Sequence, residues 1–194
     1  MKFYLIFFSM LTASISVAQA ANWRLDKSHT TIGFEVTHMV ISTVEGEFKD
    51  YQVQLNFNPE NPGEGFHVQA DIKVASVDTD NPKRDEHLRS PDFFDAAKFP
   101  VMSFKSDRLE KTDQGYVAVG TFTLHGVSKP MRLPFTVKGP VKDPWGNTRI
   151  GVGASTVINR KDFGVSWSKT MDGGGLVVSD EVTIKIQAEF ILKK

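Results

Sequence analysis

The sequence predicts an all-β fold of about eight antiparallel strands. Apolar and polar residues alternate with a period of two through most of the chain, as in strands with one buried and one solvated face. Clusters of Gly, Pro, Asn and Asp separate these runs at 58–63, 113–115, 143–147 and 172–175, where they indicate turns. The pattern alone leaves two architectures, a sandwich and a closed barrel.

The strands follow one another in chain order as alternating apolar faces. Ile32, Phe34 and Val36 form the first. A long strand is expected over 44–57, with a bulge between Phe48 and Tyr51, where the parity of the apolar positions changes. The later faces are Phe66, Val68, Ala70, Ile72 and Val74; Met102 and Phe104; Tyr116, Ala118, Phe122 and Leu124; Met131, Leu133, Phe135 and Val137; Ile150, Val152, Ala154 and Ile158; and Val182, Ile184, Ile186, Ala188, Phe190 and Leu192.

Small residues on these inward faces favour the barrel over the sandwich. Ala70, Ala118, Gly120 and Ala154 lie among phenylalanines and isoleucines. A solid core would be filled more evenly, whereas small residues on a barrel wall leave space for a ligand.

The alternation stops between Asn81 and Phe99, where a short helical insertion is expected around 82–97. Pro82 begins a charged segment that predicts a short helix, and Ser90-Pro91-Asp92 predicts the start of a second one. Phe93 and Phe94 would open that second helix. Consecutive helical residues point about 100° apart, so one is expected to face the barrel and the other its neighbour or the mouth of a binding site.

Residues 1–20 have the layout of a secretory signal peptide. Lys2 precedes an apolar run that ends in small residues and the sequence Ala18-Gln19-Ala20, which matches an A-x-A cleavage site. We therefore expect export to the periplasm and a single domain over 21–194.

Composition narrows the partners of that domain. Lys2 is one of 23 basic residues against 23 acidic ones, so the exported part has nearly balanced charge, which argues against nucleic acid and against electrostatic docking on anionic membranes. No later stretch is long and apolar enough for a transmembrane span. The chain has no cysteine, which excludes disulfides and thiolate metal sites.

Motifs for catalysis and cofactors are weak. The five histidines show no metal-binding spacing. Ser166 and Lys169 match S-x-x-K, but they lie in a glycine-flanked segment without the companion motifs of penicillin-recognising enzymes. The sequence predicts no catalytic residue, no metal site and no cofactor.

Four stretches resemble the YceI-like family, the polyisoprenoid-binding, lipocalin-like proteins of the bacterial periplasm. They are WRLDKSH at 23–29 with FEVTHM at 34–39 and GEF at 46–48; SVDTDN at 76–81 with RDEHLRS at 84–90, DFFD at 92–95 and FP at 99–100; GTFTLHGVSKP at 120–130; and NRKDFG at 159–164.

The resemblance implies an eight-stranded antiparallel lipocalin-like barrel around an apolar tunnel that holds a polyprenyl phosphate or an isoprenoid quinone. The tunnel wall is expected to include Phe34, Val36, Phe93, Phe99, Met102, Phe104, Phe122, Leu124, Phe135 and Phe163. The residues expected at or near the mouth, to contact the head group, are Arg84, Asp85, His87, Arg89 and Arg160. A basic and polar rim beside an aromatic surface suits such an amphipathic ligand.

Two other classes of function are kept as alternatives. An enzyme acting on a lipid or quinone would use His29, His38 or His125 as a base inside the tunnel. A structural or stress-response domain would have a solid interior. The sequence leaves the identity of the ligand undecided, and also whether the protein forms a homodimer.

Overall fold

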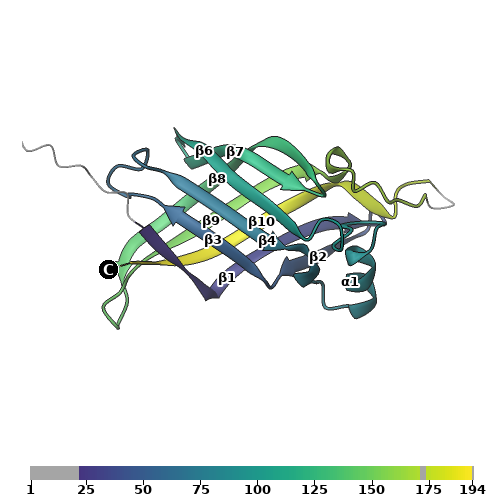
Figure 1. Ribbon diagram of the computed structural model, residues 1–194, viewed down its shortest axis with the longest axis horizontal. Coiled ribbons are helices and arrows are strands. Elements are labelled where there is room, and N and C mark those ends of the chain that lie inside the picture. The colour runs from purple at the N-terminus through teal and green to yellow at the C-terminus, as the bar shows by residue number, and fades with distance from the viewer. Residues whose placement is uncertain (1–21, 171–173, 194) are drawn as a thin grey trace, which may run out of the picture.

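The computed structural model describes residues 22–170 and 174–193, so the expected signal peptide lies outside the described residues. One antiparallel sheet dominates this part of the chain (Figure 1). Its strands are β1 (Asn22–His38), β2 (Ser42–Phe48), β3 (Tyr51–Asn56), β4 (His67–Lys73), β5 (Val77–Asp78), β6 (Val101–Thr112), β7 (Gly115–Leu124), β8 (Val127–Lys142), β9 (Thr148–Asn159) and β10 (Val178–Leu192). The helix α1 spans Pro82–Arg89, and two 3₁₀ turns span Val74–Ser76 and Arg160–Phe163.

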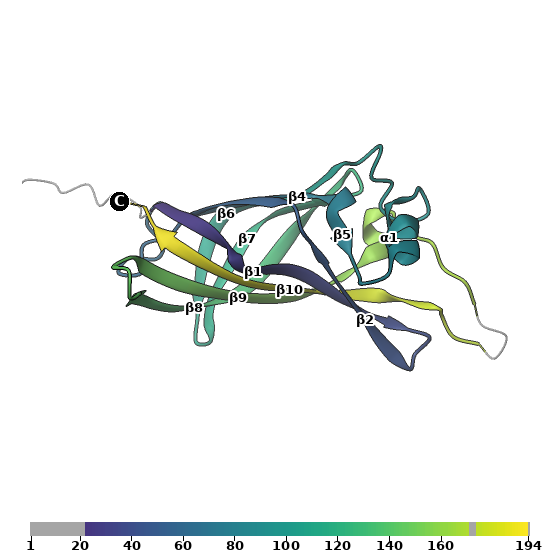
Figure 2. The same ribbon diagram turned by 90° about the horizontal axis from the view of Figure 1, so that it is seen from below.

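Eight of these strands close into a barrel in the order β10-β9-β8-β7-β6-β4-β3-β1, because β1 also pairs with β10. Trp23 lies opposite Leu192 near one end of that pair, and Val36 lies opposite Val182 near the other. The strands run obliquely along the long axis (Figures 1 and 2). The all-β, eight-stranded antiparallel barrel with one short helix is thus confirmed.

The expected single strand over 44–57 is wrong, because the chain breaks at Lys49 and Asp50 into β2 and β3. Strand β3 pairs with β4 inside the barrel. Strand β2 pairs with the C-terminal part of β1 and with β5, and β2 and β5 are not among the eight barrel strands. The Lys49 N–H donates instead to the Ser76 carbonyl at 3.1 Å. The change in parity therefore marks a change of partner rather than a bulge.

The barrel end that holds the last residues of β10 is filled by side chains. Trp23, Phe57, Ile150 and Phe190 are each at most 3% exposed. The Trp23 indole donates to the Phe57 carbonyl at 2.8 Å, which satisfies the polar atom of this cluster. Apolar packing therefore closes this end.

Gly120 does not enlarge the interior, contrary to the expectation from the sequence. A Cβ atom there would lie 2.1 Å from the Lys105 carbonyl oxygen, beside an irregularity in the β6–β7 register between Ser106 and Arg108. The buried Ser106 hydroxyl accepts a hydrogen bond from the Val68 N–H at 2.9 Å. Glycine is needed here for the close approach of two backbones.

The insertion contains one helix rather than two. The Asn81 side chain caps α1 by accepting from the Arg84 N–H at 3.1 Å, as a residue before Pro82 is expected to do. The predicted second helix is wrong, because residues from Ser90 onward form turns. The Phe93 N–H bonds to the Ser90 carbonyl, and the Phe94 N–H returns to the Leu88 carbonyl.

Candidate functional site

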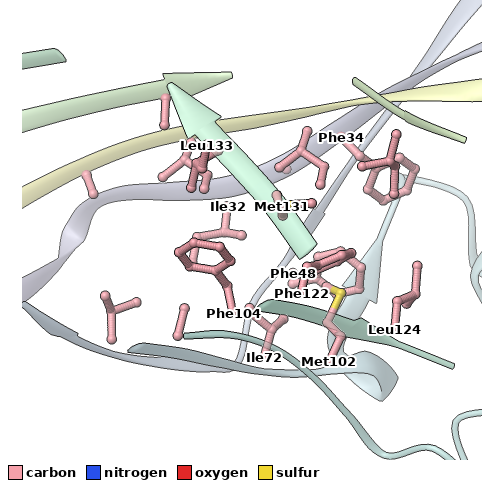
Figure 3. Close-up of a pocket in the computed structure, with 18 of the residues that line it drawn as sticks. Ile32, Phe34, Phe48, Ile72, Met102, Phe104, Phe122, Leu124, Met131 and Leu133 are labelled. Atoms are coloured by element: carbon pink, nitrogen blue, oxygen red, sulfur yellow. The ribbon is translucent and has the colours of Figure 1, made fainter. Parts of the chain in front are cut away.

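An apolar cavity occupies the barrel interior (Figure 3). The space between its lining atoms, including the open mouth, is about 1660 Å³. All eight barrel strands contribute to the wall, and only Thr30, Gly33 and Arg160 depart from apolar side chains. Ala70, Ala118 and Ala154 line the cavity, as expected. The interior is therefore not solid, which removes the premise of the structural alternative.

Most of the residues expected on the tunnel wall lie there. Eight of the ten line the cavity: Phe34, Val36, Phe93, Met102, Phe104, Phe122, Leu124 and Phe135. Figure 3 shows Phe34, Met102, Phe104, Phe122 and Leu124 together with Ile32, Phe48 and Ile72. Their role in ligand binding stays a prediction.

Phe99 and Phe163 are not found among the lining residues. Phe99 packs on the His125 ring, with 4.5 Å between ring centroids, and its ring occupies the space over Gly126. Phe163 is 4% exposed and packs edge-on against Phe122, at 5.3 Å between centroids. Both rings support neighbouring segments instead of facing the cavity.

Phe93 and Phe94 both line the cavity, together with Leu88 of α1. The expectation that they face different ways is wrong, because it assumed helical geometry and this backbone forms turns. Phe94 packs against Phe48, at 6.0 Å between centroids. The insertion, whose helix α1 lies at one end of the barrel (Figure 2), thus adds apolar side chains to the cavity wall.

For much of the remaining wall, alternation in the sequence predicted that the residues face inward, but these residues were not predicted to bind the ligand. These residues include Ile72, Met131, Leu133, Val137, Val152, Ile158, Val182, Ile184 and Ile186. Leu88 and Phe48 were missed as wall residues. Leu88 carried no usable signal, since it is the one apolar residue in a charged helix.

Four of the five residues expected to contact the head group do not line the cavity. The buried Asp85 carboxylate accepts from the Thr79 N–H at 2.9 Å and from the Thr79 hydroxyl at 2.6 Å. Arg84 donates through Nε to the same hydroxyl at 2.7 Å and through Nη2 to the Thr79 carbonyl at 2.6 Å. These two residues fix α1 to the segment before it.

Arg89 and His87 hold the other side of α1. Arg89 Nη1 donates to the carbonyls of Ala75 and Val77, both at 3.3 Å. His87 Nε2 lies 2.9 Å from Asp92 Oδ2, and its ring meets Phe93 and Trp167 edge-on. The hydrogen bonds of the charged segment are therefore with the protein itself, and they position the apolar side chains that cover the cavity.

Arg160 is the one charged residue of the cavity wall. Its guanidinium donates to the carbonyls of Val165, Trp167, Val178 and Ser179 at 2.7–3.4 Å, and its Nη2 lies 3.4 Å from Asp180 Oδ1. Burial lowers the pKa of Arg160, while Asp180 opposes that effect. These bonds tie 165–167 to the start of β10.

None of the five histidines, all of which belong to the described residues, lines the cavity. His29 is exposed on the outside, with Nδ1 3.2 Å from Asp26. The half-buried His125 packs on Phe99. The tunnel base required by the enzyme alternative is not found.

Asp26, His29 and Glu189 bring potential metal ligands within 4.8 Å of one another. Arg149 already supplies the cation, since its Nη1 lies 2.6 Å from Asp26 and 3.2 Å from Glu189. Its Nε also lies 2.7 Å from Asp143. These contacts make Asp26 and Glu189 part of an ion network centred on Arg149.

This network predicts acid sensitivity. Hydrogen bonds from Ser28 and Arg149 hold the pKa of Asp26 far below its usual value. Burial raises the pKa of Asp143, but bonds from Arg149 and Asn147 outweigh this and lower it to about 2. A carboxyl with a lowered pKa stabilises the fold fully above about pH 5 and loses that contribution as the pH falls toward 2. We expect Tm to fall over this interval.

The measurement is Tm against pH for the protein and for Arg149→Met. The variant should melt lower at pH 7 and lose less Tm on acidification. Arg108→Met is the matched control, because Arg108 is exposed and bonds Glu110 at the surface. Equal acid slopes for the protein and Arg149→Met would contradict the assignment.

An eight-stranded antiparallel barrel closed around an apolar cavity places the protein among the lipocalin-like barrels. The chain belongs to the YceI-like domain family, whose model matches residues 23–190. A UPF0312 protein of Photorhabdus laumondii is 42% identical over 155 residues, which are 79% of this chain and 80% of that protein. One from Yersinia enterocolitica is 37% identical over 187 residues, covering 95% and 93%.

Solved structures agree with this assignment. The YceI protein of Campylobacter jejuni superposes with a TM-score of 0.70 at 37% identity, covering 88% of this chain and 98% of that one. A domain from Saccharophagus degradans, described as polyisoprenoid-binding, gives a TM-score of 0.64 at 16% identity, covering 90% and 100%, and so shares the fold. The α-helix of the described residues, α1, has eight residues, too few to cross a membrane.

Proposed function

We propose that the protein binds a long-chain isoprenoid lipid in the barrel cavity and carries it through the periplasm. The observation that supports this proposal best is the cavity in the barrel interior, whose wall is apolar except at three residues. The fold shared with the polyisoprenoid-binding domain of S. degradans supports this ligand class. The signal-peptide pattern of residues 1–20 supports the location.

The physics of tail burial agrees with this ligand class. Each buried methylene contributes about 0.8 kcal/mol, so a tail of many isoprene units gains more than binding requires. The cost of ordering the tail then limits the affinity. Length and flexibility of the tail, rather than directed contacts, should therefore decide which lipids bind.

Little of the wall is available to a polar head group. The Thr30 hydroxyl donates to the Asp26 carbonyl at 2.7 Å, and the Arg160 guanidinium is bonded to protein oxygens. A head group inside the barrel would displace these bonds, so it belongs at the mouth. Both a polyprenyl phosphate and an isoprenoid quinone meet this requirement, and neither asks for a catalytic residue.

The test is to identify what the protein retains and what it accepts. Native mass spectrometry after gentle purification should show a bound lipid, identified by extraction. Titration of stripped protein with isoprenoid quinones that share one head group should give tighter binding for longer tails. Ligand-free protein that also rejects every added prenyl lipid would overturn the proposal.

A further inference from the structure

The hairpin between β1 and β2 ends in three consecutive exposed apolar residues. Met39, Val40 and Ile41 are 39%, 70% and 83% exposed. A solvent-exposed turn usually carries polar residues or glycine at such positions. Exposed apolar residues that are adjacent, rather than scattered, indicate a surface that meets another apolar phase.

The backbone conformation makes this choice of residues more costly. Met39 and Val40 have φ of 51° and 66°, a region that Gly and Asn adopt readily and a β-branched residue does not. A Val at the tip thus costs stability in two ways, through its exposure and its conformation. Such an outlier indicates a role beyond the fold.

The tip lies at the end of the barrel that carries α1, opposite the end closed by Trp23 and its buried neighbours (Figure 2). Phe34 and Val36 of β1 line the cavity, and the same strand continues to His38 beside the tip. The Met39 N–H donates to the Val177 carbonyl at 2.9 Å, next to the cavity-lining Val178. Figure 2 shows this hairpin projecting at the end of the barrel that carries α1.

The two chain segments nearest the tip also lack charged side chains. Residues 36–44 and 174–179 contain no Asp, Glu, Lys or Arg, in a chain where these make up 24%. The carbonyl of Lys169, an exposed cation, accepts from the Val177 N–H at 3.0 Å. An uncharged apolar tip beside a lysine can enter the interface of a phospholipid bilayer, where lysine keeps its charge at the head groups.

We propose that residues 39–41 insert into a phospholipid bilayer and bring the cavity mouth to its surface, so that the ligand passes between bilayer and barrel without crossing water. This rests on the proposed function. A second copy of the chain fits less well, because three side chains cover little of the 1,200 Å² or so that a specific interface buries.

The test measures transfer of a long-chain isoprenoid quinone from vesicles of phosphatidylethanolamine and phosphatidylglycerol to stripped protein. The variant Val40→Asn with Ile41→Ser should take up quinone about tenfold or more slowly, since two apolar side chains no longer enter the bilayer. Its Tm should be equal or higher, because Asn tolerates the conformation of residue 40. Floating protein with quinone-free vesicles should show the same loss of binding.

Trp145→Ser is the matched control. Trp145 is 79% exposed on the turn between β8 and β9, at the opposite end of the barrel. Its removal should leave transfer and flotation unchanged. Unchanged transfer and flotation in the 40/41 variant would overturn the proposal, as would a dimer that the variant dissociates without changing transfer.

Delivery of quinone from detergent separates the two proposals. The 40/41 variant should then load like the unmodified protein, because the bilayer step is bypassed. Protein that loads from neither source refutes the proposed ligand class, while flotation with quinone-free vesicles still decides whether the tip docks on a bilayer.

Discussion

Ala154→Phe should abolish most long-chain isoprenoid binding while the barrel stays folded. Ala154 faces the cavity from β9, opposite Phe135 on one side and Ile186 on the other. A phenyl ring there takes the space of several methylenes of the ligand. At about 0.8 kcal/mol per methylene, displacing two of them already weakens binding by about tenfold or more.

The matched control for this variant is Ser155→Phe, because Ser155 is the next residue on β9 and is exposed. Binding should be unchanged in it. The free energy of unfolding of Ala154→Phe should stay within about 2 kcal/mol of the unmodified protein, because added apolar contacts offset strain. Quinone titration and urea unfolding measure the two effects. Full affinity in Ala154→Phe would show that ligands bind elsewhere.

The wall of the cavity could be predicted from the sequence because alternation is a local property. Once Phe34, Phe104 and Phe135 fall on the inward face of their strands, closure of the sheet brings them around one space. Small residues were less informative. Ala118 leaves space in the cavity, whereas Gly120 two positions later lets the Lys105 backbone approach.

The contacts of the charged residues could not be predicted from alternation, because the sequence alone does not show which acceptor a cationic side chain will meet in the fold. Arg84 and Arg89 find backbone carbonyls of the segment before α1, which local pattern cannot foresee. Phe93 and Phe94 were placed wrongly for a related reason. Bonds back to Leu88 and Ser90 override the helical start that Ser90-Pro91-Asp92 indicates.

Arg160→Met should cause the largest loss of stability among the substitutions considered. Arg160 is 4% exposed and donates to four carbonyls contributed by 165–167 and by the start of β10. Methionine fills similar space but leaves those carbonyls without their donor, and it removes one of the two cations beside the partly buried Asp180. Breaking a buried charged contact from one side typically costs about 3–5 kcal/mol.

Lys161→Met is the matched control, because its ammonium makes only a surface ion pair with Asp180 at 2.9 Å. Such pairs contribute about 0–1 kcal/mol. Arg160→Lys should fall between the two, since an ammonium keeps the charge but has three donors and no planar fork. Urea unfolding ranks the three variants.

Quinone binding by Arg160→Lys then separates two roles of Arg160. If Arg160 only ties the mouth together, binding should weaken in proportion to the loss of stability. If its guanidinium contacts the head group, phosphate-bearing prenyl lipids should lose more affinity than quinones with the same tail, because an anion depends more on a directed fork of donors. With each guanidinium nitrogen already bonded to protein oxygens, we expect equal losses for the two lipids. A larger loss of affinity for the phosphate-bearing lipid would instead show that Arg160 gives up a hydrogen bond to a carbonyl in order to bind the head group.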